Sequence, residues 1–269
     1  DEIIYDTFAS MHVREAAVTD ELINIAAENA DVAVITLSRF SAEGVDRKPI
    51  DSDYYLSFEE KSLINRASKA FKKTIVVLNS GAVVDCEHFA DNDKVQGILF
   101  GWQGGLEGGA AVADILCGDV CPSGKLADTI PVSYYSYQNA EEFLTGFEHL
   151  DYYDDIYVGY RYFETVPGAA ERVRYPFGFG LSYTDFELSG VLCGETDGKI
   201  VVSVNVKNIG SVPGKETVQL YYSAPKGVLG KPAKELAAFA KTHLLNPGES
   251  ETLGELRRPR QGKESRLCA

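Results

Sequence analysis

The sequence predicts an α/β fold followed by an all-β sandwich, and three observations support this fold class. First, short apolar runs rich in β-branched residues stand at 32–37, 74–78 and 95–100. Second, helical patterns separate these runs, which is typical of right-handed βαβ units and a mostly parallel sheet. Third, from about residue 186 the apolar period becomes two and turn signals recur, as in an immunoglobulin or fibronectin type III-like sandwich.

The helical patterns of the first half have recognisable starts. Residues 19–30 form an amphipathic pattern that Thr19 or Asp20 can cap. A capping box, with a serine followed three residues later by a glutamate, opens a second helix over 57–71. A third helix is expected over 110–116, where a glycine-rich loop ends.

Two interpretations of the glycine-rich loop 101–109 are open. A phosphate-binding loop is one, because backbone N–H groups at the start of a helix attract anions. However, the loop contains neither G-x-G-x-x-G nor G-x-x-x-x-G-K-[ST]. Close packing of the loop and helix against neighbouring backbone is therefore favoured. Trp102, the only tryptophan, is interpreted as a core contact rather than as part of a pocket wall.

The second half is divided by changes in composition. Residues 126–132 predict a short extended segment, and 133–165, rich in tyrosine and acidic residues, predict a long functional or linking excursion. The aromatic and glycine-rich segment 175–186 is expected to be a connector fixed by aromatic burial. We therefore predict an α/β sandwich domain at 1–165, a connector at 166–186 and a fibronectin type III-like sandwich at 187–269.

Within the predicted β-sandwich, Val202, Val204 and Val206 fall on one face of a strand. A turn is expected at 247–250, where proline and glycine stand together. The following residues, 254–269, are basic and polar and show no strand alternation. The sandwich is therefore expected to be incomplete and to end in an atypical tail.

Composition excludes several classes of partner. Of the 269 residues, 45% are hydrophobic, and the formal net charge is −14. Such an acidic surface repels nucleic acid and anionic lipid, so neither is an expected partner. No apolar segment is long enough to span a bilayer, and the first residues do not resemble a signal peptide. The five cysteines are irregularly spaced and lack the two-residue spacing of a redox or zinc pair, which predicts cytoplasmic thiols and no metal site.

The loop after the apolar run 32–37 is the candidate site. The run itself is expected to be a buried parallel strand, and loops at the carboxyl ends of such strands carry the chemistry of open α/β sheets. Small residues flank Glu43, so the backbone can turn tightly and present this carboxyl group. Asp46 and Arg47 can hold the loop by ion pairing and hydrogen bonding. An ordinary acidic surface loop is the alternative interpretation.

Several motifs follow one another along the chain. The first, over 41–47, reads Ser-Ala-Glu-Gly-Val-Asp-Arg. The others stand at 76–81, 105–110, 118–126, 157–163, 176–184, 219–221 and 247–250. Together they resemble the C-terminal half of family 3 glycoside hydrolases, the β-glucosidase and β-xylosidase group. The resemblance covers about 20–253, and the order of the motifs makes it specific.

The resemblance implies a role for Glu43. In this family the acid/base glutamate lies in a loop of the α/β sandwich that reaches over a TIM-like barrel, and Glu43 matches that position. The implied enzyme is a retaining, exo-acting β-glycosidase, foremost a β-glucosidase, that removes terminal sugars from β-glucosides or oligosaccharides without a cofactor. The nucleophilic aspartate comes from the barrel, and no segment here carries its motif. The chain alone is therefore expected to be inactive and to need a barrel in the same or a companion chain.

Other classes of function stay open at this point. A non-catalytic module is the alternative, in which the β-sandwich binds polysaccharide or serves as a scaffold. Glu43 discriminates between the two, because a scaffold has no need for a carboxyl group presented between small residues at a strand end. A nucleotide-binding α/β protein is disfavoured by the missing phosphate-loop fingerprints. Self-association into a homo-oligomer is also left open.

Overall fold

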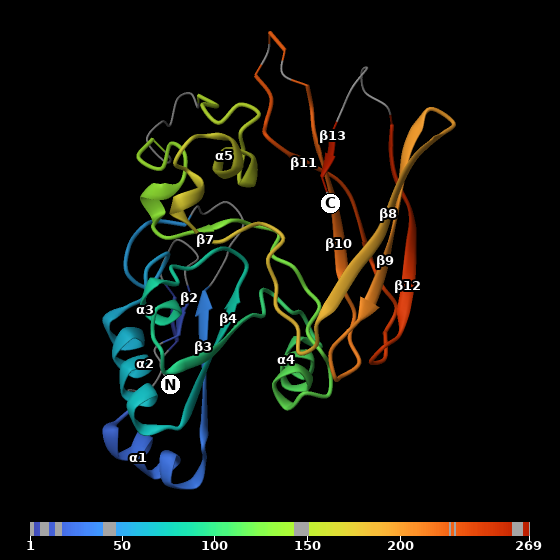
Figure 1. Cartoon of the computed structure of the whole chain (residues 1–269). Coiled ribbons are helices and arrows are strands. Elements are labelled where there is room, and N and C mark those ends of the chain that lie inside the picture. Colours follow the sequence, from blue (N-terminus) through green and yellow to red (C-terminus); the bar gives the residue numbers. More distant parts are fainter. Residues whose placement is uncertain are drawn as a thin grey trace. The chain divides into compact units, whose positions relative to one another are not determined.

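The computed structural model describes residues 3–5, 11–13, 18–39, 47–142, 151–225, 227–228, 230–259 and 266–268. The chain divides into two compact units (Figure 1). The first unit contains Asp1–Val112 with Val132–Tyr134, and the second contains Ala113–Pro131 with Tyr135–Ala269. The domain limits expected near residues 165 and 187 stay a prediction.

A parallel sheet forms the centre of the first unit, as the sequence predicts. It consists of β3 (Val32–Arg39), β4 (Lys73–Ser80) and β5 (Val95–Phe100), in the order β3-β4-β5. All three strands run parallel, so their carboxyl ends meet at one edge of the sheet. Two short strands, β1 (Ile3–Tyr5) and β2 (Met11–Val13), form a separate antiparallel pair.

Two helices beside this sheet begin where the sequence predicts. Thr19 caps α1 (Asp20–Asn29), and a capping box opens α2 (Phe58–Ala70). Figure 1 shows α1 next to α2, and α2 lies on β3 and β4. Ile64 of α2 is completely buried, so the apolar face of this helix covers one face of the sheet. A short helix, α3 (Glu87–Ala90), follows β4.

Burial of β3 differs from the expectation of a wholly buried strand. Ile35 and Leu37 are buried, but Val34 on the opposite face is 48% exposed, and Val32 is also exposed. Buried and exposed side chains alternate along the strand, so one face of β3 packs on the core and the other face is left open. An apolar run therefore indicated the strand correctly but overestimated how much of it is covered.

The glycine-rich loop packs closely at two positions, which confirms the favoured interpretation there. A side chain at Gly104 would place its Cβ 2.7 Å from the Cα of Gly108, and one at Gly101 would lie 3.3 Å from the carbonyl oxygen of Leu78. The helix α4 (Gly108–Cys117) begins inside this segment, two residues before the expected start at 110. Trp102 is half-buried and lies against Phe100, with ring centroids 5.7 Å apart.

Alanine at two glycines of this region should change stability in opposite directions. Gly104→Ala is expected to lower the free energy of unfolding by about 2 kcal/mol, because its new Cβ meets backbone that cannot move aside. Gly109→Ala should raise it by about 0.5 kcal/mol, since this position is helical and has open space around it. Urea unfolding followed by Trp102 fluorescence measures both effects. A loss of stability in both variants would contradict this account.

The second unit contains a β-sandwich, which confirms the predicted all-β fold. One sheet has the order β12-β9-β8 and is built from β8 (Phe186–Thr196), β9 (Lys199–Asn208) and β12 (Ser250–Pro259). The other has the order β11-β10-β13 and is built from β10 (Thr217–Ser223), β11 (Glu235–Lys241) and β13 (Arg266–Cys268). Val202, Val204 and Val206 are all buried between them, as their spacing predicts.

The segment after residue 254, in which the sequence shows no strand alternation, contains strands. β12 continues to Pro259 and pairs with β9 along its length, and β13 pairs with β10. The register of β12 shifts between Leu253 and Leu256. Such a bulge interrupts the alternation of faces, which explains why no strand is visible in the sequence.

A bulge also interrupts β8. Its register on β9 shifts between Ser189 and Leu192, and Gly190 between them has a φ of +60°. Glycine tolerates this left-handed backbone conformation without steric cost. The strand is thereby divided into two paired segments.

A buried amide joins the strands and loops at one end of the sandwich. Asn208 has no exposed surface, and its Oδ1 accepts hydrogen bonds from Thr184 Oγ1 at 2.7 Å and from the Gly210 amide at 3.0 Å. Its Nδ2 donates to the carbonyl oxygens of Val212 at 2.8 Å and Leu245 at 2.9 Å. Every polar atom of this side chain is therefore satisfied.

Removing that amide should destabilise the sandwich strongly. Asn208→Ala leaves several buried groups without a partner and is expected to lower the free energy of unfolding by about 3 kcal/mol. Asn205→Ala is the matched control, because its Nδ2 makes one long hydrogen bond of 3.5 Å to Ser189 Oγ. The control should cost less than about 0.5 kcal/mol. Differential scanning calorimetry of the two variants tests the difference, and equal shifts would refute it.

The predicted connector is fixed by aromatic contacts, as expected. Tyr175 and Phe179 stack with ring centroids 5.5 Å apart, and Phe177 stacks on Tyr160 at 4.5 Å. The connector contributes β7 (Val173–Tyr175), which pairs with β6 (Ile130–Pro131). Within the preceding excursion lie the 3₁₀ turn η1 (Tyr134–Ser136), the helix α5 (Tyr160–Thr165) and the 3₁₀ turn η2 (Ala170–Arg172).

Polar contacts hold α5 against β11. The hydroxyl oxygen of Tyr160 accepts a hydrogen bond from the Leu236 amide at 2.7 Å, and Glu164 pairs with Lys234 at 2.8 Å. Burial, with Tyr160 and Glu164 nearby, raises the pKa of Tyr221 to about 12. The Tyr221 phenol therefore stays protonated and donates to the side chain of Gln219. These contacts dock α5 on the β-sandwich within the second unit.

Candidate functional site

The candidate acid/base residue, Glu43, lies outside the described residues. The same holds for Ser41, Gly44 and Asp46 of its motif. Described on either side are Arg39, the last residue of β3, and Arg47. The site is therefore built from these two ends of the loop 40–46 and from the groups that they contact.

Arg39 is anchored in a dense polar network at the carboxyl end of β3. Its guanidinium forms a bidentate pair with Glu60, through Nη1 at 2.6 Å and Nη2 at 2.8 Å. Its Nε donates to the carbonyl oxygen of Asp53 at 2.7 Å, and further donors reach the carbonyls of Ser38 and Tyr55. The side chain is 6% exposed, so water screens these bonds little.

Arg47 anchors the other end of the loop, as the sequence predicts. Its Nε donates to the Asp53 carboxylate and its Nη2 to the Asp53 carbonyl oxygen. Its Nη1 reaches Ser80 Oγ at 3.4 Å, at the carboxyl end of β4. The other carboxylate oxygen of Asp53 accepts from the Lys48 amide at 2.8 Å. The loop thus begins and ends beside the carboxyl ends of two neighbouring strands.

A tightly folded turn presents Asp53 to both arginines. The amide of Ile50 donates to the Lys48 carbonyl at 2.8 Å, and the amide of Asp53 donates to the Ile50 carbonyl at 3.3 Å. Ser52 has a φ of +66°, a left-handed conformation that is uncommon outside glycine. Sequence reasoning did not identify Arg39 or Asp53. The sequence signal for Arg39 is its place as a basic residue at the end of an apolar strand. A charge at such a position needs a partner nearby.

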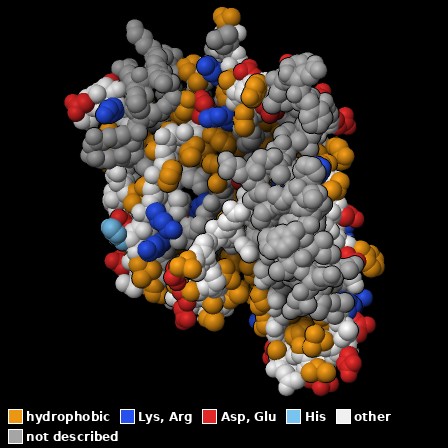
Figure 2. Space-filling view, turned by 180° about the vertical axis from the view of Figure 1, so that it is seen from behind, with side chains coloured by type: hydrophobic (Ala, Val, Ile, Leu, Met, Phe, Trp, Pro, Cys, Tyr) orange, Lys and Arg blue, Asp and Glu red, His pale blue; other side chains and the backbone are white. Residues whose placement is uncertain are grey.

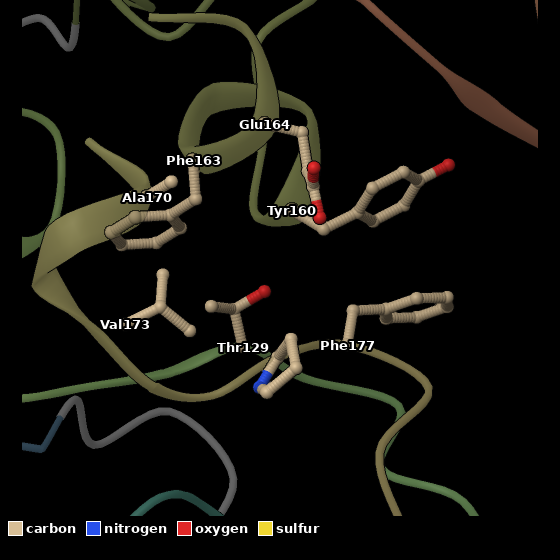
Figure 3. A pocket seen from close by; sticks show the side chains of 8 residues that line it. Thr129, Tyr160, Phe163, Glu164, Ala170, Val173 and Phe177 are labelled. Atoms are coloured by element: carbon tan, nitrogen blue, oxygen red, sulfur yellow. The ribbon is translucent and has the colours of Figure 1, made fainter. Parts of the chain in front are cut away.

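A separate pocket of about 250 Å³ lies beside α5 in the second unit (Figure 3). Its walls are mostly apolar and aromatic, and include Phe163, Val173 and the stacked rings of Tyr160 and Phe177. Glu164 is the one carboxyl group on its wall, and it is paired with Lys234. A single, paired carboxylate does not supply the two carboxyl groups of glycoside hydrolysis.

Acidic, basic and hydrophobic side chains are interspersed over the face seen in Figure 2. No three His, Cys, Asp or Glu side chains of the described ranges gather where they could hold a metal ion. Among the same residues, no helix has the length and apolar character needed to cross a membrane.

The two units define a class of chain in which an α/β domain with a parallel sheet is followed by a β-sandwich. The model of the glycosyl hydrolase family 3 C-terminal domain matches residues 11–183, and that of the fibronectin type III-like domain matches residues 216–254. The chain therefore belongs to glycosyl hydrolase family 3.

Similar proteins and structures agree with this assignment. The chain is 46% identical to β-glucosidase A of Butyrivibrio fibrisolvens, over 89% of its own length and 33% of that protein. It matches the structure of a β-glucosidase from Paenibacillus barengoltzii with a TM-score of 0.84 and 41% identity, over 91% of this chain and 27% of that one. For β-glucosidase 3B from Thermotoga neapolitana in complex with glucose, the TM-score is 0.83 and the identity 42%, over 93% of this chain and 35% of that one. The chain thus spans between 27% and 35% of the length of these relatives.

Proposed function

We propose that this chain is the part of a retaining, exo-acting β-glucosidase that supplies the general acid/base, Glu43. A TIM-like barrel in the same or a companion chain supplies the nucleophilic aspartate and most of the sugar contacts. The observation that carries the proposal is the fixed position of Arg39 and Arg47, the two described residues that flank 40–46 at the carboxyl end of β3. The names of the relatives support the substrate class, β-linked glucosides or oligosaccharides.

The proposed reaction has two steps. The aspartate attacks the anomeric carbon while the Glu43 carboxyl group protonates the departing glycosidic oxygen, which leaves a covalent glycosyl-enzyme. The Glu43 carboxylate then removes a proton from water, which attacks the same carbon and releases the sugar with retained configuration. The two carboxyl groups must stand about 5–5.5 Å apart for this course. Closure against the barrel would remove water from Glu43 and raise its pKa, as an acid working near neutral pH requires.

The chain by itself should not hydrolyse aryl glycosides. A two-carboxylate mechanism loses most of its rate when either carboxyl group is missing, and the nucleophile is expected from the barrel. A chromogenic aryl β-glucoside incubated with the purified chain measures this directly. Glu43→Gln in the same chain is the control, and robust turnover that this substitution leaves unchanged would place the active site elsewhere.

The alternative, a carbohydrate-binding or scaffold module, makes different predictions. Such a module would bind soluble β-glucan without the barrel, and Glu43→Gln would leave the hydrolytic rate of the complete enzyme unchanged. Calorimetric titration of the chain with the glucan, together with that rate, decides between the two functions.

A further inference from the structure

The two ends of the loop that carries Glu43 meet at one backbone atom. Arg39 Nε and Arg47 Nη2 both donate to the carbonyl oxygen of Asp53. Only the seven residues 40–46 separate these arginines along the chain. The shared acceptor therefore brings the entry and the exit of the loop to a common point.

Charge balance makes this meeting point stable. Two guanidinium groups on one oxygen repel each other, and each is neutralised by its own carboxylate. Glu60 forms a bidentate ion pair with Arg39, and Asp53 forms an ion pair with Arg47. The exposed fractions of the two arginine side chains are 6% and 16%, so neither charge is strongly screened by water.

Asp53 is itself held in place by its turn. Its carboxylate accepts the Lys48 amide, and its own amide donates to Ile50. Ser52 beside it has a left-handed backbone conformation, which persists in a non-glycine residue only where the surrounding structure fixes it. Asp53 thus offers a backbone oxygen and a carboxylate at fixed positions to both ends of the loop.

We propose that Asp53 is a positioning residue for general acid/base catalysis, acting through the ends of the Glu43 loop. This inference rests on the proposed function of Glu43. Proton transfer needs the donor within hydrogen-bond reach of the leaving oxygen, and catalytic groups must be held within about 0.5 Å of their working positions. Arg39 and Arg47 each stand four residues from Glu43 in the sequence, so fixing both arginines limits the distance over which the chain between them can carry Glu43.

Asp53→Asn in the complete enzyme tests the inference. The amide keeps the shape of the side chain but loses its charge and one of the two carboxylate acceptors. We expect kcat/KM to fall about thirtyfold for alkyl β-glucosides, whose poor leaving groups need protonation, within the range of general acid effects. For dinitrophenyl β-glucoside the loss should stay below about threefold, because that leaving group departs without help. A purely structural role would slow both substrates alike.

Asp51→Asn is the matched control, since it makes the same change two residues away on an exposed side chain. It should alter neither rate by more than about twofold. If Asp53→Asn fails to fold, Arg47→Lys replaces it, because an ammonium group cannot reach the Asp53 carboxylate and carbonyl in the same fork geometry. The same leaving-group dependence is expected.

Glu43→Gln, measured on the same substrates, distinguishes the acid/base role of Glu43 from the positioning role of Asp53. If it steepens the leaving-group dependence and Asp53→Asn does not, the inference about Asp53 is overturned and the proposed function stands. If Glu43→Gln itself leaves the dependence flat, both are overturned. Steeper dependence in both variants, with Asp51→Asn unchanged, is the expected result.

Discussion

Glu43→Ala in the complete enzyme is expected to reduce kcat/KM for an alkyl β-glucoside about a thousandfold, as loss of a general acid does. For dinitrophenyl β-glucoside, kcat/KM should change little, because the first step then needs no protonation. Its kcat should nevertheless fall, because hydrolysis of the glycosyl-enzyme becomes slow when no base activates the attacking water. The two substrates therefore report the acid and the base roles of one carboxyl group separately.

Azide provides the positive test of the same substitution. It is a nucleophile that needs no general base, so it should restore turnover of dinitrophenyl β-glucoside by the Glu43→Ala enzyme. The product should be a glycosyl azide of retained configuration, identified by NMR. Glu59→Ala, which removes an exposed carboxylate from α2, is the control and should behave as the unaltered enzyme. Equal losses on all substrates without azide rescue would assign Glu43 a structural role.

The second large effect concerns stability. Glu60→Ala leaves the guanidinium of Arg39, 6% exposed, without its carboxylate. It also removes the acceptor that closes the capping box at the Ser57 amide. Breaking a buried ion pair from one side costs about 3–5 kcal/mol, because an uncompensated charge stays behind. We expect the free energy of unfolding of the first unit to fall by that amount.

Trp102 makes the measurement selective, because it is the only tryptophan and lies in the first unit. Urea unfolding followed by its fluorescence should show a midpoint at lower urea concentration for Glu60→Ala. The midpoint of Glu59→Ala should hardly shift. The double variant Arg39→Met, Glu60→Leu should recover part of the loss, since it removes both charges together. Failure of the double variant to recover any stability would show that the pair is not the cause.

The first half of the chain was largely predictable because its signals are local. A capping box and a run of β-branched residues are fixed by neighbours in the sequence, and both α2 and the parallel strands were confirmed. β11 was not identified. Its alanine-rich sequence lacks a strand pattern, and it is a strand because it pairs with β10 and packs alanines over the core.

The candidate site also contains one contact that was predictable from the sequence and one that was not. Arg47 was expected to hold the loop, and its hydrogen bonds to Asp53 confirm this. The contribution of Arg39 could not be predicted, because its partner Glu60 is 21 residues away and is brought near only by the fold. Interactions of that range depend on how a helix lies on a sheet, which local patterns do not specify. The role of Glu43 stays a prediction.

The bulge at Gly190 bears on how the chain behaves in concentrated solution. β8 has β9 as its one strand neighbour in the described structure, so its other side offers backbone donors and acceptors to any second strand. A straight edge of eleven residues would be a long template for fibre growth. The left-handed glycine breaks this template into two short pieces, neither of which can hold a neighbouring molecule by many consecutive bonds. We therefore expect the bulge at Gly190 to disfavour edge-to-edge pairing of β8 between molecules.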